Sequence, residues 1–261
     1  MANEINEKEY GKTYSDLYDL LTSHKNYKYE AQACNRLIRK HQESTKTMLS
    51  IGCGTGSHEI FLSKNYRIFG VDKSASMLAL AKSKAKKNKN LDFGDIENCT
   101  NFIAGNKYDC AISLFNVINC IHKNEDIHDF LSKIHSKLKG ILILELWNGD
   151  LALQAPPRPV ERRFQTLKYD LVRTCYPTIL RNGRTVHLDY KTRGTYGGDI
   201  FFHNTRQTIR LHSISKIIDA LRNIGFEIIE TLSALPNLRS ENDILAKERQ
   251  LLIVANNNIK F

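Results

Sequence analysis

The stretch "TMLSIGCGTGSHEIFLSK", residues 47–64, decides the fold. An apolar run at residues 48–51 leads directly into Gly52, Gly54 and Gly56, and the chain then becomes amphipathic. This order predicts a strand, a glycine turn and the start of a helix, an arrangement whose backbone N–H groups can meet an anion or a polar cofactor. The loop reads G-x-G-x-G, whereas a dinucleotide site has G-x-G-x-x-G, so the spacing disfavours an NAD-dependent oxidoreductase.

Short apolar runs alternate with amphipathic segments from the glycine loop onward. Strands are expected at residues 48–51, 66–71, 91–93, 108–114 and 141–146, and helices at 57–63, 74–86 and 125–138. This alternation predicts an α/β fold with a doubly wound, mostly parallel sheet, because central parallel strands are buried on both faces and read as continuous apolar runs. The run "ILILEL" at residues 141–146 is of this kind.

The pattern changes after Trp147. The segment "QAPPRP", residues 154–159, cannot continue a helix or an inner strand. Three β-like pieces follow, near residues 166–173, 185–195 and 205–212, with "RNG" and "YGGD" as turn signals between them. These features predict an antiparallel insert, after which a helix at 213–223 and strands at 226–231 and 251–256 close the chain.

The predicted organisation has three parts. Residues 1–47 form an N-terminal helical lid, residues 48–147 and 213–261 form a cofactor-binding core, and residues 148–212 form a β-rich cap. Within the lid, residues 9–42 are expected to be helical. That segment carries five tyrosines: Tyr10, Tyr14, Tyr18, Tyr27 and Tyr29.

Composition narrows the class of protein. No stretch approaches the roughly 20 apolar residues of a membrane span, and the polar, acidic N-terminus does not resemble a signal peptide. The six cysteines form no C-x-x-C pair, so we expect reduced thiols, no metal site and a cytoplasmic protein. The net charge is +10, and residues 158–210 hold eleven Lys and Arg against four Asp and Glu.

Three features are expected at the carboxyl ends of successive strands, where doubly wound folds bind their ligands. The first is the glycine loop. The second is Asp72, which ends "RIFGVD" and could accept both hydroxyls of a ribose. The third is Asp95 in "LDFGDI", which could accept the exocyclic amine of an adenine. A glycine loop alone fits any tight turn, but two acids in register with it point to a nucleoside.

Four stretches resemble the successive motifs of class I S-adenosylmethionine-dependent methyltransferases: "MLSIGCGTGSHEIFLSK", "IFGVDKSASMLALAKSK", "LDFGDI" and "YDCAISLFNVIN". The N-terminal segment and the insert are similar, more loosely, to the subgroup that N-methylates amino sugars on a nucleotide diphosphate. "LELWNGDLALQ" with a basic stranded insert also resembles surface-polysaccharide methyltransferases. The resemblance implies a seven-stranded Rossmann-like sheet in which only the last strand runs antiparallel.

The same resemblance implies a cofactor, S-adenosylmethionine, with S-adenosylhomocysteine as product, and a set of residues around it. The glycines would face the methionine part, Asp72 the ribose, Met77 and Ile96 the adenine with Asp95, and residues 114–116 the sulfonium. The full set is Tyr14, Tyr18, Tyr27, Gly52, Cys53, Gly54, Gly56, Asp72, Lys73, Met77, Asp95, Ile96, Leu114, Phe115 and Asn116.

Ser50 departs from the pattern of this family, which places Asp or Glu at this position. That acid helps to organise the loop and the ammonium group of the cofactor. A serine hydroxyl accepts one hydrogen bond, worth only about 1 kcal/mol net. We therefore expect a weaker anchor, support from the N-terminal tyrosines, and tighter cofactor binding in Ser50→Asp.

His122 and Tyr14 are the candidate catalytic residues. Methyl transfer needs an acceptor with a free lone pair, so a base near neutral pKa helps. His122, just past "FNVINC", fits that role, although a surface histidine fits its position equally well, and the tyrosines at helical spacing also fit plain packing. Candidate substrate-binding residues are Asn119, Trp147, Asn148 and Arg210, with Glu145 beside them.

The arginines of the insert predict the substrate class. They suit bidentate phosphate contacts, and we expect a small anionic acceptor, a nucleotide-linked sugar or a surface-polysaccharide precursor, methylated on N or O. The arginines in question are Arg158, Arg162, Arg163, Arg173, Arg181, Arg184 and Arg210. An RNA methyltransferase also suits the charge, but the chain has no N-P-P-Y-like tetrapeptide. A non-catalytic cofactor-binding scaffold and a homodimer both stay open, whereas no nucleic acid and no membrane partner is expected.

Overall fold

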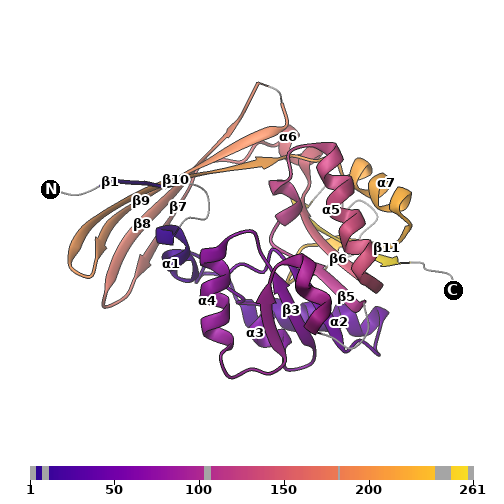
Figure 1. The fold of residues 1–261 in the computed structure, drawn as a ribbon. Coiled ribbons are helices and arrows are strands. Elements are labelled where there is room, and N and C mark those ends of the chain that lie inside the picture. Colours follow the sequence, from indigo (N-terminus) through magenta and orange to yellow (C-terminus); the bar gives the residue numbers. More distant parts are fainter. Residues whose placement is uncertain (1–3, 8–11, 103–106, 182, 239–247, 258–261) are drawn as a thin grey trace.

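The strand that leads into the glycine loop lies within a seven-stranded sheet (Figure 1). The computed structural model describes residues 4–7, 12–102, 107–181, 183–238 and 248–257. The strand order is β11-β12-β6-β5-β2-β3-β4. The strands are β2 (Thr47–Ile51), β3 (Arg67–Val71), β4 (Leu91–Gly94), β5 (Tyr108–Ser113), β6 (Leu138–Trp147), β11 (Phe226–Ser233) and β12 (Gln250–Asn257).

Only β12 runs against its neighbours. β2 pairs in parallel with β3 and β5, and β5 pairs in parallel with β6, whereas β12 is antiparallel to both β6 and β11. The sequence-based prediction of a doubly wound sheet with one antiparallel strand is therefore confirmed. In such a sheet the loops after β2, β3, β4 and β5 gather at one edge.

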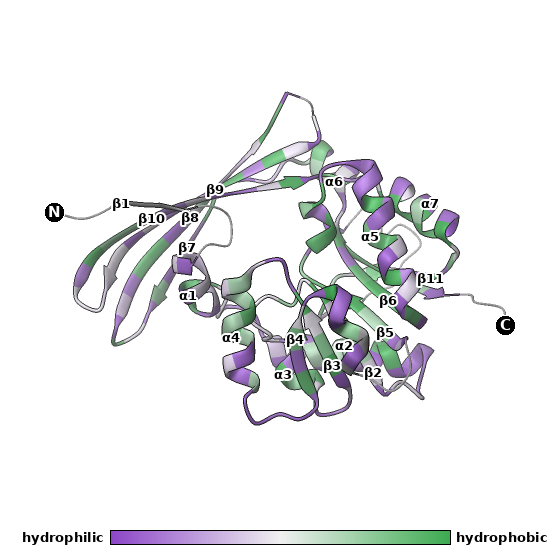
Figure 2. Cartoon of the chain, viewed as in Figure 1, coloured by the Kyte–Doolittle hydropathy of each residue, from purple (hydrophilic) through white to green (hydrophobic). Residues whose placement is uncertain are grey.

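Helices cover both faces of this sheet. The helical elements are α3 (Glu59–Leu62), α4 (Ala75–Ala85), η1 (Ile96–Phe102), η2 (Val117–Cys120), α5 (Asn124–Lys137) and α7 (Ile214–Ile224). One apolar cluster joins the sheet to α5 and α7, and a second joins its other face to α4 and to the N-terminal helix α2 (Tyr27–His41). Figure 2 shows the central strands as the most hydrophobic part of the chain, because burial of apolar area drives this packing.

A second, five-stranded sheet extends from one end of the core (Figure 1). Its order is β1-β10-β9-β8-β7, with antiparallel pairing from β10 to β7 and parallel pairing of β1 to β10. The strands are β1 (Glu4–Glu7), β7 (Val160–Gln165), β8 (Tyr169–Ile179), β9 (Thr185–Tyr196) and β10 (Asp199–Arg210). The antiparallel insert is confirmed, but the sequence pattern missed β7, β1 and the short helix α6 (Gly149–Gln154).

Two N-terminal helices precede the core sheet; the first packs against α4 and the second sheet, and the second covers one face of the core sheet. They are α1 (Lys12–Leu21) and α2 (Tyr27–His41), and the Asn26 side chain caps α2 by accepting a hydrogen bond from the Tyr29 N–H. Residues 9–11 of the predicted helical segment, including Tyr10, lie outside the described residues. Tyr14, Leu17 and Leu21 of α1 pack with Met77 of α4 and with residues of β7 and β8. The division into lid, core and cap stays a prediction.

The described helices include none long and apolar enough to cross a membrane.

Asn119 joins the two sheets at the base of the insert. Its side chain is fully buried; its Nδ2 donates to the Arg210 carbonyl oxygen at 2.8 Å, and its Oδ1 accepts from the Trp147 N–H at 2.9 Å. One amide thus ties the end of β6 to the end of β10.

Asn119→Ala is expected to lower the free energy of unfolding by about 2 kcal/mol, because it leaves two buried backbone groups without these bonds. Chemical denaturation of both proteins measures the change. Asn223→Ala is the matched control, since Asn223 is an exposed residue of α7 and should shift stability by less than about 0.5 kcal/mol. Equal stability of Asn119→Ala and the unmodified chain would contradict the role of this joint.

Candidate functional site

The backbone of the glycine loop adopts a conformation that residues with a side chain rarely adopt. Gly52, Gly54 and Gly56 all have positive φ, at 69°, 55° and 74°. A Cβ on Gly52 would lie 2.2 Å from Cγ2 of Val117, so both the conformation and the space require glycine there. The Gly52 N–H donates to the Val71 carbonyl oxygen at 2.8 Å, which fixes the loop to the end of β3.

Asp72 links this loop to the helix that follows β3. One carboxylate oxygen accepts a hydrogen bond from the Gly54 N–H at 2.8 Å, and the other accepts from the Ser74 N–H at 2.9 Å. Ser74 is in turn the N-cap of α4, and its hydroxyl accepts from the Met77 N–H. The half-buried carboxylate is thereby held at the mouth of a cavity with lone pairs left for a ligand.

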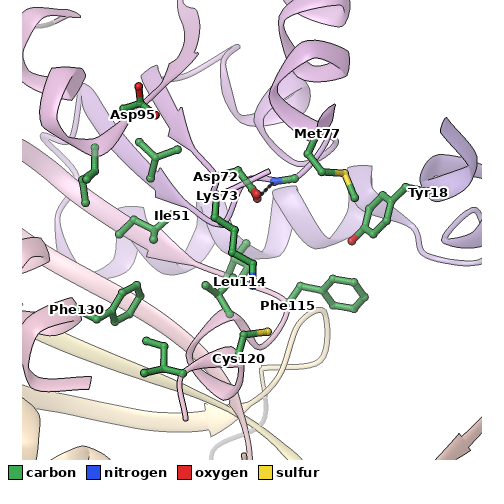
Figure 3. Close-up of a pocket in the computed structure, with 16 residues that line it drawn as sticks. Tyr18, Ile51, Asp72, Lys73, Met77, Asp95, Leu114, Phe115, Cys120 and Phe130 are labelled. Carbon is green, nitrogen blue, oxygen red and sulfur yellow. Dashed lines mark hydrogen bonds between the residues drawn. The ribbon is translucent and has the colours of Figure 1, made fainter. Parts of the chain in front are cut away.

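A cavity of about 470 Å³ opens at the carboxyl ends of β2, β3, β4 and β5. Asp72 lies between Tyr18 and Met77 on one side and Asp95 on the other (Figure 3). The remaining walls are mostly apolar: Ile51, Val71, Ile96, Leu114, Val117, Ile121 and Phe130. Apolar walls suit a flat base, and the two acids suit ribose hydroxyls and an amine. We call this space the cofactor cavity.

A small cavity of about 30 Å³ lies beneath the glycine loop. It shares Ile51, Gly52 and Phe115 with the cofactor cavity, and Ser50 and Glu59 form part of its own wall. Ser50 is buried, and its hydroxyl donates to Oε1 of Glu59 at 2.6 Å. The carboxylate of Glu59, the first residue of α3, therefore lies beside Ser50.

A third cavity, of about 360 Å³, lies between α1, the end of β6 and the second sheet. It shares Tyr18, Phe115 and Cys120 with the cofactor cavity, so the two spaces meet at these side chains. We call it the acceptor cavity. Its described lining includes no Asp or Glu, but it holds one histidine and three arginines: His24, Arg158, Arg162 and Arg173.

Arg173 is the most firmly held of these cations. Its guanidinium lies 3.8 Å from the ring centroid of Tyr190, and one of its N–H groups donates to the Tyr14 hydroxyl at 3.4 Å. The same hydroxyl accepts from the Gln207 amide at 3.1 Å. Cation–π contact and hydrogen bonding keep the charge on the inner face of the second sheet.

Phe115 stands where the three cavities meet. It and Asn116 have left-handed backbones, with φ of 61° and 63°, a conformation that costs energy in a bulky residue. The Phe115 N–H donates to Glu145 at 2.7 Å, and Nζ of Lys25 lies 3.7 Å from its ring centroid. Burial raises the pKa of Glu145, which is enclosed at the end of β6. The turn is thus held from both sides.

Acidic residues attach the N-terminal helices to the loop region. Asp19 of α1 accepts from the Thr55 hydroxyl at 2.6 Å and pairs with Lys84 of α4 at 2.5 Å. Glu30 of α2 pairs with His58 at 2.7 Å and with Lys25 at 3.2 Å. Burial alone would raise the pKa of Glu30, but the hydrogen bond from His58 and the charge of Lys25 lower it overall.

Most of the residues predicted for the cofactor line these connected spaces. Those on the cofactor cavity are Tyr18, Gly52, Gly54, Asp72, Lys73, Met77, Asp95, Ile96, Leu114 and Phe115. Tyr27 and Cys53 line the small cavity, and Tyr14 and Asn116 line the acceptor cavity, as does Trp147. Gly56 packs against Phe93 and lines none of the three.

Two predicted residues lie outside both large cavities. His122 is exposed and lines neither the cofactor cavity nor the acceptor cavity, since the chain turns outward there toward α5. Arg210 lines a separate cavity beside α5 and α7, together with Arg184. The alternation of β10 explains this: Gln207 and Ile209 face the acceptor cavity, so Arg210 faces the other side.

Asn119 and Asn148, predicted to bind substrate, both make hydrogen bonds within the chain. Asn119 makes the buried joint described above. Asn148 is the N-cap of α6, and its side chain accepts from the Leu151 N–H at 3.2 Å. Neither lines the acceptor cavity.

Sequence reasoning missed His24, Lys25, Glu59 and Tyr190. His24 and Lys25 lie in the connection between α1 and α2, where no motif marks them. Glu59 stands within the glycine-loop stretch itself, but its hydrogen bond with Ser50 is apparent only in the structure. Tyr190 lies on the same face of β9 as Val186 and Leu188, because alternate residues of a strand share a face, so a strand-face analysis places it beside Leu188.

Comparison with known proteins agrees with this geometry. Residues 48–140 match the family model described as a methyltransferase domain. The carboxy-S-adenosyl-L-methionine synthase of Campylobacter jejuni is 32% identical over 123 residues, 45% of this chain and 51% of that protein. The dTDP-3-amino-3,6-dideoxy-alpha-D-glucopyranose N,N-dimethyltransferase of Streptomyces fradiae is 26% identical over 144 residues, 53% of this chain and 55% of that protein. The chain thus spans about half the length of these curated relatives.

Among solved structures, the sugar N-methyltransferase KedS8 from Streptoalloteichus has a TM-score of 0.77 at 17% identity, with 98% of this chain and 97% of that chain covered. The chain therefore has the same fold as this solved structure, and a cavity opens at the carboxyl edge of its sheet. Over residues 48–140 the chain is thus similar to methyltransferase domains.

Asp72→Ala is expected to weaken binding of S-adenosylhomocysteine by tenfold or more, because a charge-assisted hydrogen bond is worth about 1.5–3 kcal/mol. Asp95→Ala should weaken it as well. Isothermal titration calorimetry measures both. Asp92→Ala is the matched control, since Asp92 is exposed on β4 and lines none of the three cavities. Unchanged affinity in Asp72→Ala would remove the ribose role of Asp72.

Proposed function

We propose that this protein transfers a methyl group from S-adenosylmethionine to N or O of a small anionic acceptor. The observation that carries the proposal is the acceptor cavity: three arginines line it, its described lining has no carboxylate, and it meets the cofactor cavity at Tyr18 and Phe115. Arginine is suited to phosphate and carboxylate groups because its planar fork donates two parallel hydrogen bonds.

The residues present fit the cofactor. Asp72 and Asp95 offer carboxylates for ribose and adenine, the buried Met77 lines the same cavity, and Gly52 and Gly54 line it without side chains. When bound, S-adenosylmethionine supplies an electrophilic methyl group on a sulfonium. The chain's own contribution is positioning and exclusion of water, which are sufficient to lower the barrier of an in-line displacement substantially.

A nucleotide-linked sugar, or a precursor of a surface polysaccharide, is the proposed acceptor. Its phosphates would meet Arg158, Arg162 and Arg173, and the sugar would lie toward Phe115 and Trp147. The name of the Streptomyces fradiae relative, a dimethyltransferase of a dTDP-linked amino sugar, supports this choice.

His24 takes the place of His122 as the proposed proton acceptor. Its imidazole lines the acceptor cavity. Partial burial, followed by the positive charge of Arg162, lowers its pKa below the ordinary imidazole value. A lowered pKa keeps the ring neutral at neutral pH, so it can receive the proton that an amine or hydroxyl acceptor must lose.

An acceptor panel tests the proposal. Nucleotide-linked sugars, free sugars and bulk tRNA are incubated with the protein and S-adenosylmethionine, and release of S-adenosylhomocysteine is measured. We expect release with nucleotide-linked sugars. Release with tRNA alone would show an RNA methyltransferase, and cofactor binding without release from any acceptor would show a scaffold.

Arg162→Ala is expected to raise KM for the anionic acceptor by about tenfold, since a hydrogen bond to a charged group is worth about 1.5–3 kcal/mol. KM for the cofactor should stay constant. The neighbouring Arg163→Ala is the matched control, because Arg163 pairs with Asp170 at 2.6 Å and does not line the cavity. Equal KM values for the two variants would remove the anion-binding role of the cavity.

The pH profile of kcat/KM should fall on the acid side with an apparent pKa below the ordinary imidazole value of about 6.5. The sign follows from the base role: His24 works when neutral, so activity is present above its pKa and is lost as the pH falls through it. His24→Gln should lower kcat by about a hundredfold and abolish this limb. Arg162→Ala should move the limb to higher pH, because it removes a charge that lowers the pKa. A limb that stays in place in His24→Gln would exclude His24.

A further inference from the structure

Glu59 is a buried acid whose second oxygen has no partner. The residue is 2% exposed, and its Oε1 accepts from the Ser50 hydroxyl at 2.6 Å. Its Oε2 is buried and makes no hydrogen bond to any described residue. A carboxylate removed from water with an unsatisfied oxygen is costly unless a cation or a donor meets it.

The nearby cations of the chain are already engaged. His58, the preceding residue, pairs with Glu30 at 2.7 Å, and Lys25 pairs with Glu30 at 3.2 Å. No ion pair joins Glu59 to a basic side chain within the described ranges. The partner of Oε2 must therefore come from outside these side chains.

The place for that partner is the small cavity, which Glu59 lines. Its volume of about 30 Å³ suits a group of a few atoms, such as an ammonium or a water molecule. Ile51, Gly52, Gly54 and Phe115 line both this cavity and the cofactor cavity, so it lies at the glycine-loop end of the cofactor cavity.

We propose that Glu59 binds the α-ammonium of S-adenosylmethionine through Oε2, with Ser50 as the positioning residue that holds the carboxylate. This assignment rests on the proposed function, because it takes that cofactor as the ligand. The acid is supplied by α3, and the strand end beside it carries only a hydroxyl. Ser50 and Glu59, which are hydrogen-bonded to each other, together replace the acid that this family places at the strand end.

Ser50 acts by orientation in this arrangement. Its hydroxyl bonds one carboxylate oxygen at 2.6 Å, so the other oxygen is turned away from the strand. An aspartate at this position would place a second carboxylate against Glu59. We therefore expect Ser50→Asp to weaken cofactor binding, which reverses the expectation drawn from the sequence alone.

Binding calorimetry on the full chain separates the contacts. The probes are S-adenosylhomocysteine, decarboxylated S-adenosylmethionine, which keeps an ammonium and lacks the carboxylate, and 5′-methylthioadenosine, which lacks both. Glu59→Gln keeps an oxygen for Ser50 and removes the charge. We expect it to weaken the first two ligands by tenfold or more and to leave 5′-methylthioadenosine within twofold.

Every other pattern of affinities would overturn the assignment, and each pattern points to a different reason. Unchanged S-adenosylhomocysteine affinity removes Glu59 from the site and leaves the proposed function standing. Equal losses for all three ligands mean that Glu59 supports only the loop. A loss for S-adenosylhomocysteine without one for the decarboxylated ligand assigns Glu59 to the carboxylate end. If the unmodified chain binds none of them, the proposed function fails too.

Ser50→Asp supplies a second measurement should Glu59→Gln fold poorly, as judged by thermal unfolding without ligand. Weaker binding of S-adenosylhomocysteine than in the unmodified chain, with 5′-methylthioadenosine unchanged, supports the assignment. Equal or tighter binding overturns it, because an added carboxylate would then not compete with Glu59 for the same cation.

Discussion

The hydrogen bond between the Gly54 N–H and the Asp72 carboxylate is the contact on which the site depends. It links the loop that follows β2 to the residue that follows β3, and so positions the glycine loop against the end of β3. The same carboxylate also receives the Ser74 N–H at the start of α4. Glycine adopts the three positive φ angles of the loop at little steric cost, and the acid of the next strand fixes the loop at Gly54.

Charge is divided between the two large cavities. Carboxylates gather around the cofactor side, at Asp72, Asp95 and Glu59, whereas the described lining of the acceptor side has cations and no carboxylate. Phe115 lies between them on a left-handed turn that Glu145 holds. The acidic and the basic linings therefore meet at one aromatic residue.

The sequence was sufficient for the central sheet and for most of the cofactor cavity. Strand β2, its glycines and Asp72 follow one another closely in the chain, so the local sequence pattern was enough to predict that they lie together. The acceptor side was harder to predict. His24 and Tyr190 are brought there by α1 and β9, segments far apart in sequence, and Arg210 was misplaced by a single step of strand alternation. Strand β1 escaped prediction because four residues beginning at Glu4 gain their pairing only from β10.

The position of Phe115 has a thermodynamic consequence. Because Phe115 lines both large cavities, a ligand in either one would contact the same turn. Linkage then requires reciprocity: whatever factor the first ligand applies to the affinity for the second, the second applies to the first. The order in which the two ligands arrive can change the rates of the individual steps, but it leaves the free energy of the ternary complex the same.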